Sequence, residues 1–113
     1  MNWNRLDSKE TLDKIIEDSN ENPIVIFKHS TSCSISAMAL NRLERSWNES
    51  EMAEVKAYYL DLISYRDISN TVAEIFGVMH QSPQVLLIKN GECVYDDSHM
   101  GISYQNLKSG VAA

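Results

Sequence analysis

The chain has 113 residues, a length that fits one domain with a single core. Sixteen Asp and Glu against ten Lys and Arg give a net charge of −6, and an acidic surface argues against binding to nucleic acid or membranes. The sequence contains no signal segment and no apolar run of membrane-spanning length, so the expected location is cytoplasmic. Two cysteines are too few for a disulfide framework, and the cytosol keeps thiols reduced, so each cysteine serves either packing or chemistry.

The first half of the chain alternates helical and strand patterns. Asp7 and Glu10 form a capping box, which predicts a helix that ends near Asn20. Residues 24–27 are a continuous run of apolar residues after Pro23, which is typical of a strand buried on both faces. From Ser34 onward, apolar residues recur at helical spacing. We expect the apolar side chains of this helix to lie in the core, among them Met38, Leu43 and Trp47.

The second half predicts a strand over residues 54–62, a helix over residues 64–76 that ends at Gly77, and a short last helix over residues 103–109. Asn90-Gly91 is a strong hairpin signal between two further strands, residues 84–89 and 92–95. Strands joined through helices run parallel, whereas the hairpin pair is antiparallel. The whole chain, residues 1–113, is therefore predicted to be one α/β domain with a four-stranded mixed sheet and helices on both faces.

Cys33 lies in the segment KHSTSCSISAM, where the first buried strand gives way to a helix. A thiol at that junction faces the unpaired N–H groups and the positive dipole end of the helix, and both favour the thiolate. Ser36 stands one turn further on and could direct its hydroxyl at the sulfur. The alternative interpretation is that Cys33 only packs in a loop, but its small and polar neighbours argue against burial.

Several motifs together resemble the thioredoxin superfamily, and more narrowly its monothiol bacilliredoxins. They are His29-Ser-Thr-Ser-Cys33-Ser-Ile-Ser36, Gly77-Val-Met-His-Gln-Ser-Pro-Gln84, Asn90-Gly91 and His99-Met-Gly-Ile102. The likeness spans nearly the whole chain and implies a thioredoxin-like fold with a cis peptide bond before Pro83. One departure is Ser34, because members of that family often have proline after the cysteine; its loss loosens the first helical turn.

The resemblance also implies an activity, that of a thiol-disulfide oxidoreductase which removes bacillithiol from protein mixed disulfides. Cys33 would be the attacking thiol and Ser36 would occupy the position of a resolving cysteine, so the mixed disulfide has no intramolecular exit. The implied substrate-binding residues lie around the thiol: Ser32, Ser34, His80, Ser82, Pro83 and Gly101. The implied partners are bacillithiolated proteins and bacillithiol itself, a small-thiol co-substrate, with no tightly bound cofactor and a monomeric protein.

Other candidate residues carry weaker signals. Cys93 lies inside the last strand, where core packing is preferred to a role as resolving thiol. His29, His80 and His99 lack metal-ligand spacing, so no metal site is predicted, although His80 could lie near the sulfur or meet the carboxylates of bacillithiol. Asp96 and Asp97 resemble the acidic pair that glutaredoxins use on a small thiol, but a solvated turn at the strand end is favoured.

Two other functions remain open at this stage. A thioredoxin-like module without catalytic activity could bind a partner or sense oxidants through modification of Cys33. A protein similar to monothiol glutaredoxins could instead hold a shared iron–sulfur cluster, but Ser34 and Ile35 replace the Gly and Phe of that loop.

Overall fold

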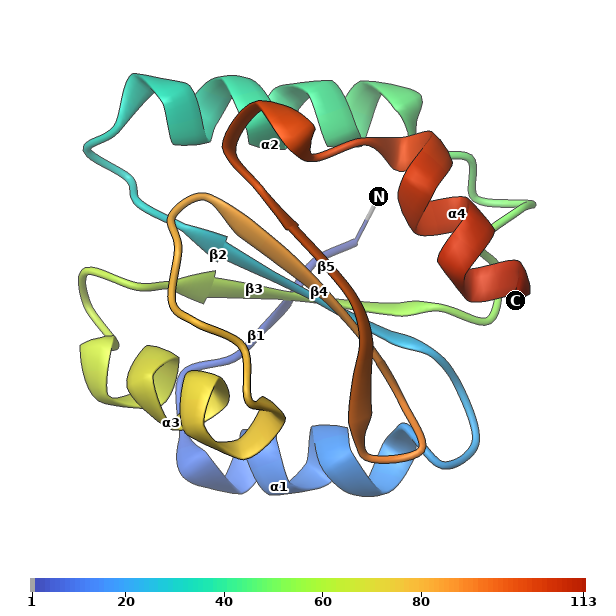
Figure 1. The fold of residues 1–113 in the computed structure, drawn as a ribbon, viewed down its shortest axis with the longest axis horizontal. Helices are drawn as coiled ribbons and strands as arrows, with labels where there is room; N and C mark the ends of the chain where they lie inside the picture. The colour runs from blue at the N-terminus through green and yellow to red at the C-terminus, as the bar shows by residue number, and fades with distance from the viewer. Residues whose placement is uncertain (1) are drawn as a thin grey trace.

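The computed structural model describes residues 2–113 and contains a mixed sheet between two layers of helices (Figure 1). The elements follow one another as β1 (Asn4–Arg5), α1 (Lys9–Asp18), β2 (Ile24–His29), α2 (Ser34–Ser46), β3 (Lys56–Asp61), α3 (Arg66–Phe76), β4 (Gln84–Lys89), β5 (Glu92–Ser98), the short 3-10 helix η1 (His99–Gly101) and α4 (Tyr104–Ala112). Within residues 2–113, the helices lack the length and apolar character that a membrane span requires.

The sheet has five strands in the order β1-β3-β2-β4-β5. Strands β1 and β2 run parallel to β3, whereas β4 is antiparallel to both β2 and β5. The predicted α/β class, the mixed sheet and its helical layers are confirmed, but the strand number is five instead of four. The additional strand was not predicted because Asn4 and Arg5 are exposed and polar and form only a two-residue edge pairing with β3.

Each face of the sheet has its own core, which explains the unbroken apolar run in β2. On one face, Ile24 and Ile26 pack with side chains of α1 and α3, such as Leu12 and Val72. On the other face, Val25 and Phe27 pack with side chains of α2 and α4, such as Leu43 and Leu107. Figure 1 shows α1 and α3 below the sheet and α2 and α4 above it. A central strand covered on both sides favours apolar residues on both of its faces, as in residues 24–27.

Several helix boundaries and one core residue differ from the sequence prediction. The N-cap of α1 is Ser8, whose hydroxyl accepts a hydrogen bond from Thr11 N, and not Asp7. Met38 was expected in the core but is 61% exposed, because α2 buries only the narrow stripe that contains Ser36, Ala39 and Leu43. Gly77 ends α3 in the left-handed conformation, as predicted, with φ of 65°.

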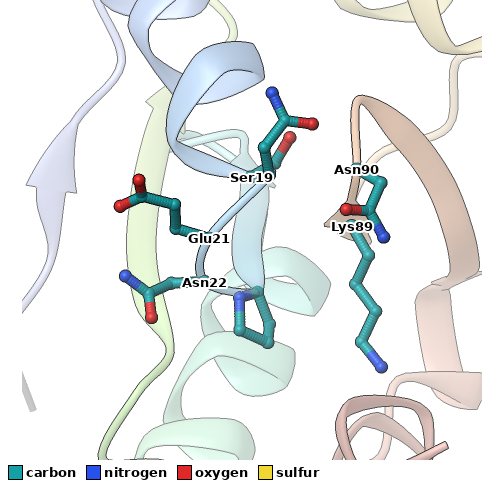
Figure 2. Close-up of a pocket in the computed structure, with 7 residues that line it drawn as sticks. Ser19, Glu21, Asn22, Lys89 and Asn90 are labelled. Carbon is teal, nitrogen blue, oxygen red and sulfur yellow. The ribbon is translucent and has the colours of Figure 1, made fainter.

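A polar pocket of about 230 Å³ lies at the end of the sheet remote from Cys33 (Figure 2). There Ser19, which follows α1, accepts hydrogen bonds from the β4–β5 turn: its carbonyl oxygen from Asn90 N and its Oγ from Gly91 N, both at 2.8 Å. Lys89 Nζ donates to the carbonyl oxygens of Val111 and Ala113, which helps α4 to continue beyond its predicted end at Ser109. These contacts give the pocket a structural role.

Candidate active site

Cys33 is the N-cap residue of α2 and is half-buried, with a free thiol. Its N–H donates to Ser30 O in the preceding turn, and its carbonyl oxygen accepts from Ala37 N, each at 3.1 Å, so α2 begins directly after it. The sulfur makes no capping hydrogen bond, so the side chain of the N-cap residue leaves the first N–H groups of α2 without a partner. The predicted place of Cys33 at the junction between strand and helix is confirmed.

The Ser36 hydroxyl is not directed at Cys33 as the sequence analysis expected. The side chain is fully buried, and its Oγ accepts a hydrogen bond from Ser30 N at 3.1 Å and lies 2.6 Å from His29 Nδ1. The bond from Ser30 N leaves the hydroxyl proton free, and the hydroxyl donates it to His29 Nδ1 when that nitrogen carries no proton. The serine thus joins the end of β2 to the first turn of α2, a contact that the spacing of residues 29 and 36 could not reveal.

His29 lies beneath the same turn and is only 7% exposed. Burial lowers the pKa of its imidazole, while the negative charges of Asp61 and Glu44 act in the opposite direction. A neutral ring agrees with a Nδ1 atom that accepts the Ser36 hydroxyl proton. No role was predicted for His29 beyond its exclusion from a metal site, whereas it is part of the support of the Cys33 turn.

The loop of residues 77–83, between α3 and β4, lies at the same end of the sheet. Strand β4 is antiparallel to β2 with Gln84 opposite Lys28, so Pro83 precedes β4 where β2 leads into the Cys33 turn. The Ser82–Pro83 peptide bond is cis, which confirms the expectation drawn from the family likeness. Ser82 Oγ is a buried atom without a hydrogen-bond partner among residues 2–113. The predicted substrate-binding segments thus lie at one end of the sheet.

The short helix η1 lies at the same end of the sheet. His99 N donates to Pro83 O at 3.0 Å, and His99 Nε2 lies 3.1 Å from Gln81 Oε1, so η1 is fixed beside the loop of residues 77–83. Gly101 is exposed, and a side chain at that position would collide with the carboxylate of Asp97. Asp97 belongs to β5, where it accepts hydrogen bonds from Tyr95 Oη and Ser98 N, so the expected solvated turn at Asp96 and Asp97 is corrected.

The remaining site predictions have different outcomes. Ser32 and Ser34 are exposed on either side of Cys33, where they can meet a substrate, and His80 is half-buried in the loop of residues 77–83.

Cys93 packs against the core and its Sγ donates to Tyr95 O; burial raises the pKa of its thiol. It lies opposite Ile88, which pairs with Ile24 at the far end of β2. In the described part of the chain, residues 2–113, no group of three or more His, Cys, Asp or Glu could hold a metal ion.

The buried charge of Lys28, at this end of the sheet, was not predicted from the sequence. Lys28 has no exposed surface, and its Nζ donates to Ser69 O at 3.1 Å and lies 3.4 Å from His80 Nδ1. The available signal was the strand itself, in which a lysine follows four buried apolar residues.

Comparison with known proteins agrees with this arrangement. The family profile described as "Monothiol bacilliredoxin BrxC" matches residues 4–107. The chain belongs to the monothiol bacilliredoxin family. A solved structure described as a candidate oxidoreductase with a thioredoxin fold is 31% identical and has a TM-score of 0.81; the match covers 94% of this chain and 90% of that one. Family membership and fold support a thiol redox function for this bacilliredoxin.

Thioredoxins share the fold at lower identity. The thioredoxin of Fasciola hepatica is 19% identical, with a TM-score of 0.73 and 97% of each chain covered. That of Malassezia sympodialis is 16% identical, with a TM-score of 0.76, and the match covers 98% of this chain and 89% of that one. At such identity the likeness concerns the fold alone.

Proposed function

We propose that this bacilliredoxin is a monothiol thiol-disulfide oxidoreductase that removes bacillithiol from protein mixed disulfides. The observation that carries the proposal is the pairing of a half-buried thiol at the N-terminus of α2 with a fully buried serine three residues later. A resolving cysteine at position 36 would close an intramolecular disulfide, whereas a serine leaves the mixed disulfide to an external thiol. The cytoplasm, where thiols are kept reduced, is the proposed place of the reaction.

The proposed reaction has two exchange steps. The Cys33 thiolate attacks the bacillithiol sulfur of the mixed disulfide, the bond between that sulfur and the target protein breaks, and the target leaves as a thiolate that takes up a proton. Cys33 then carries bacillithiol until the thiolate of a second bacillithiol attacks the bound bacillithiol sulfur. That step releases Cys33 and forms bacillithiol disulfide. Over both steps the target sulfur is reduced and the sulfur of the second bacillithiol is oxidised, while the first bacillithiol stays at the disulfide level.

Cys93 is a poor candidate for a resolving thiol. Its partner Ile88 lies four residues along β4 from Gln84, which at about 3.3 Å per strand residue is about 13 Å from the site end of the sheet. Disulfide formation requires α-carbons within about 7 Å. We therefore assign both exchange steps to Cys33.

A mass-spectrometric experiment tests the proposal. The wild-type protein is mixed with a model protein that carries bacillithiol on its only cysteine, and both proteins are weighed during the reaction. We expect the target to lose bacillithiol, Cys33 to gain it, and free bacillithiol to restore Cys33. Cys33→Ser should abolish the transfer and Cys93→Ser should retain most of the rate. A Cys33 adduct that forms with oxidants but never by transfer from the target would favour a redox sensor instead.

A further inference from the structure

The buried ammonium group of Lys28 lies directly behind the loop of residues 77–83. Lys28 is on the central strand β2, on the face covered by α1 and α3, and it lies between Leu60 of β3 and Gln84 of β4. Its exposed fraction is 0%. The ion pairs described for residues 2–113 join Lys56 to Asp18 and Lys108 to Glu51, and Lys28 takes part in neither. An isolated buried charge is costly, so an apolar residue here would favour stability.

The contacts of Lys28 connect three elements. Nζ donates to Ser69 O in α3 at 3.1 Å and approaches His80 Nδ1 of the loop within 3.4 Å, while Ser69 Oγ lies 3.2 Å from the same nitrogen. Gln84, opposite Lys28 in β4, donates through Nε2 to Met79 O at 3.0 Å. Two side chains from neighbouring strands therefore hold consecutive loop residues, Met79 and His80, from below.

The chemistry of the pair fixes the state of His80. An ammonium group can only donate hydrogen bonds, so His80 Nδ1 must accept, and the ring is neutral with its proton on Nε2. Protonation of Nδ1 would place an N–H against the ammonium group and break the contact. Burial lowers the pKa of Lys28 to about 8, and burial together with the charges of Lys28 on β2 and Arg66 on α3 lowers the pKa of His80.

We propose that Lys28 is a positioning residue of the exchange site, whose buried ammonium group holds the loop of residues 77–83, through His80, in the shape that receives a mixed disulfide beside Cys33. The proposal rests on the proposed function, because it assigns the loop to the docking of that substrate. It explains why a costly charge is kept where an apolar side chain would be more stable. It also accounts for the orientation of His80, which faces inward to Lys28 and Ser69.

The test compares Lys28→Met with Lys56→Met, the same change at a lysine that pairs with Asp18 on the surface at the other end of the sheet. Two rates are measured at neutral pH: transfer of bacillithiol from the model target, and alkylation of Cys33 by iodoacetamide, which does not need the loop. For Lys28→Met we expect transfer to fall about tenfold or more, since small misplacements near a reacting group are costly. Alkylation should change less than about twofold, and the unfolding midpoint should not decrease. Lys56→Met should leave both rates unchanged.

Two outcomes would overturn the proposal: an unchanged transfer rate in Lys28→Met, or equal losses of transfer and alkylation, which would indicate an effect on the thiol itself. If Lys28→Met does not fold, His80→Asn and His80→Leu replace it, because asparagine keeps an acceptor for the ammonium group and leucine does not. We expect His80→Asn to transfer bacillithiol at least about fivefold faster than His80→Leu. Equal rates of the two variants would contradict the anchoring role.

A third measurement is independent of bacillithiol. Nitrogen-15 NMR of the histidine rings should show that His80 takes up its proton at a higher pH in Lys28→Met than in the wild-type protein, because a neighbouring positive charge has been removed. An unchanged titration would refute the contact between Lys28 and His80. A wild-type protein that fails to transfer bacillithiol but shows this coupling would refute the proposed function and the docking role of Lys28, while the contact itself would stand.

Discussion

Substitution of Ser36 by alanine tests the support of the Cys33 turn. The variant removes the oxygen that accepts Ser30 N–H and that lies 2.6 Å from His29 Nδ1, and it leaves two polar groups of the turn without their partner. An unpaired buried polar group costs about 1–3 kcal/mol. Water can reach the partly buried Ser30 N–H more easily than His29, which is 7% exposed. We therefore expect Ser36→Ala to lower the free energy of unfolding by about 2 kcal/mol.

Chemical denaturation in urea at neutral pH measures this loss, with Ser109→Ala as the matched control. Ser109 is an exposed helical serine whose Oγ donates to Gln105 O, so its loss should cost less than about 0.5 kcal/mol. For a chain of 113 residues, each kcal/mol corresponds to a melting-temperature change of about 4 °C. Equal losses in the two variants would refute the assigned role of the Ser36 hydroxyl.

The alkylation rate of Cys33 separates support of the turn from direct action on the sulfur. Since the Ser36 hydroxyl is already bonded to Ser30 N and His29, Ser36→Ala should change the rate by less than about twofold, because the rate follows the thiolate fraction. A large decrease would show that the hydroxyl reaches the sulfur in solution and would restore the interpretation made from the sequence.

Two further predictions follow from the contacts of the site. Ser36→Cys places a second thiol one helical turn from Cys33, and the variant should reduce insulin disulfides, which the wild-type protein should not do; equal insulin reduction by both would contradict the monothiol mechanism. Burial lowers the pKa of Lys28 to about 8, so between that pH and its ordinary value of 10.5 the unfolded chain binds more protons than the folded chain. The free energy of unfolding should therefore rise with pH in the wild-type protein but not in Lys28→Met. Urea titrations between pH 7.5 and 9.5 measure this rise below the ionisation of the tyrosines, and a rise that persists in Lys28→Met would assign it to another group.

The fold was predictable from the sequence because its signals are local. The apolar run of β2, the Asn90-Gly91 turn and Gly77 each specify their own conformation, and these elements are found where the sequence predicts them. The misses concern tertiary contacts. Met38 has helical apolar spacing, yet nothing in the sequence shows how narrow the buried stripe of α2 is. Strand β1 has no apolar pattern and exists only through its pairing with β3.

For the candidate site too, local features could be predicted from the sequence and tertiary contacts could not. The place of Cys33 follows from a strand that runs into a helix, and the motif around Pro83 was carried by the family likeness. The partners of the polar side chains were not predictable. Ser36 bonds to a residue seven positions earlier, and Lys28 meets groups 41 and 52 positions away, and such pairings are set by how the elements pack. Sequence identifies the proposed reacting atom more readily than it identifies what holds that atom in place.

The serine at position 36 therefore does more than replace a resolving cysteine. A hydroxyl both accepts from a backbone N–H and offers a proton to a neutral imidazole, and Ser36 uses both capacities, with Ser30 and His29. A thiol in the same place is a weak donor and a weak acceptor, and its larger sulfur would enter a site with no free surface. Gain of a dithiol activity by Ser36→Cys should thus come with a loss of stability. The serine that leaves Cys33 without a partner thiol at position 36 thus also fixes the turn on which Cys33 is presented.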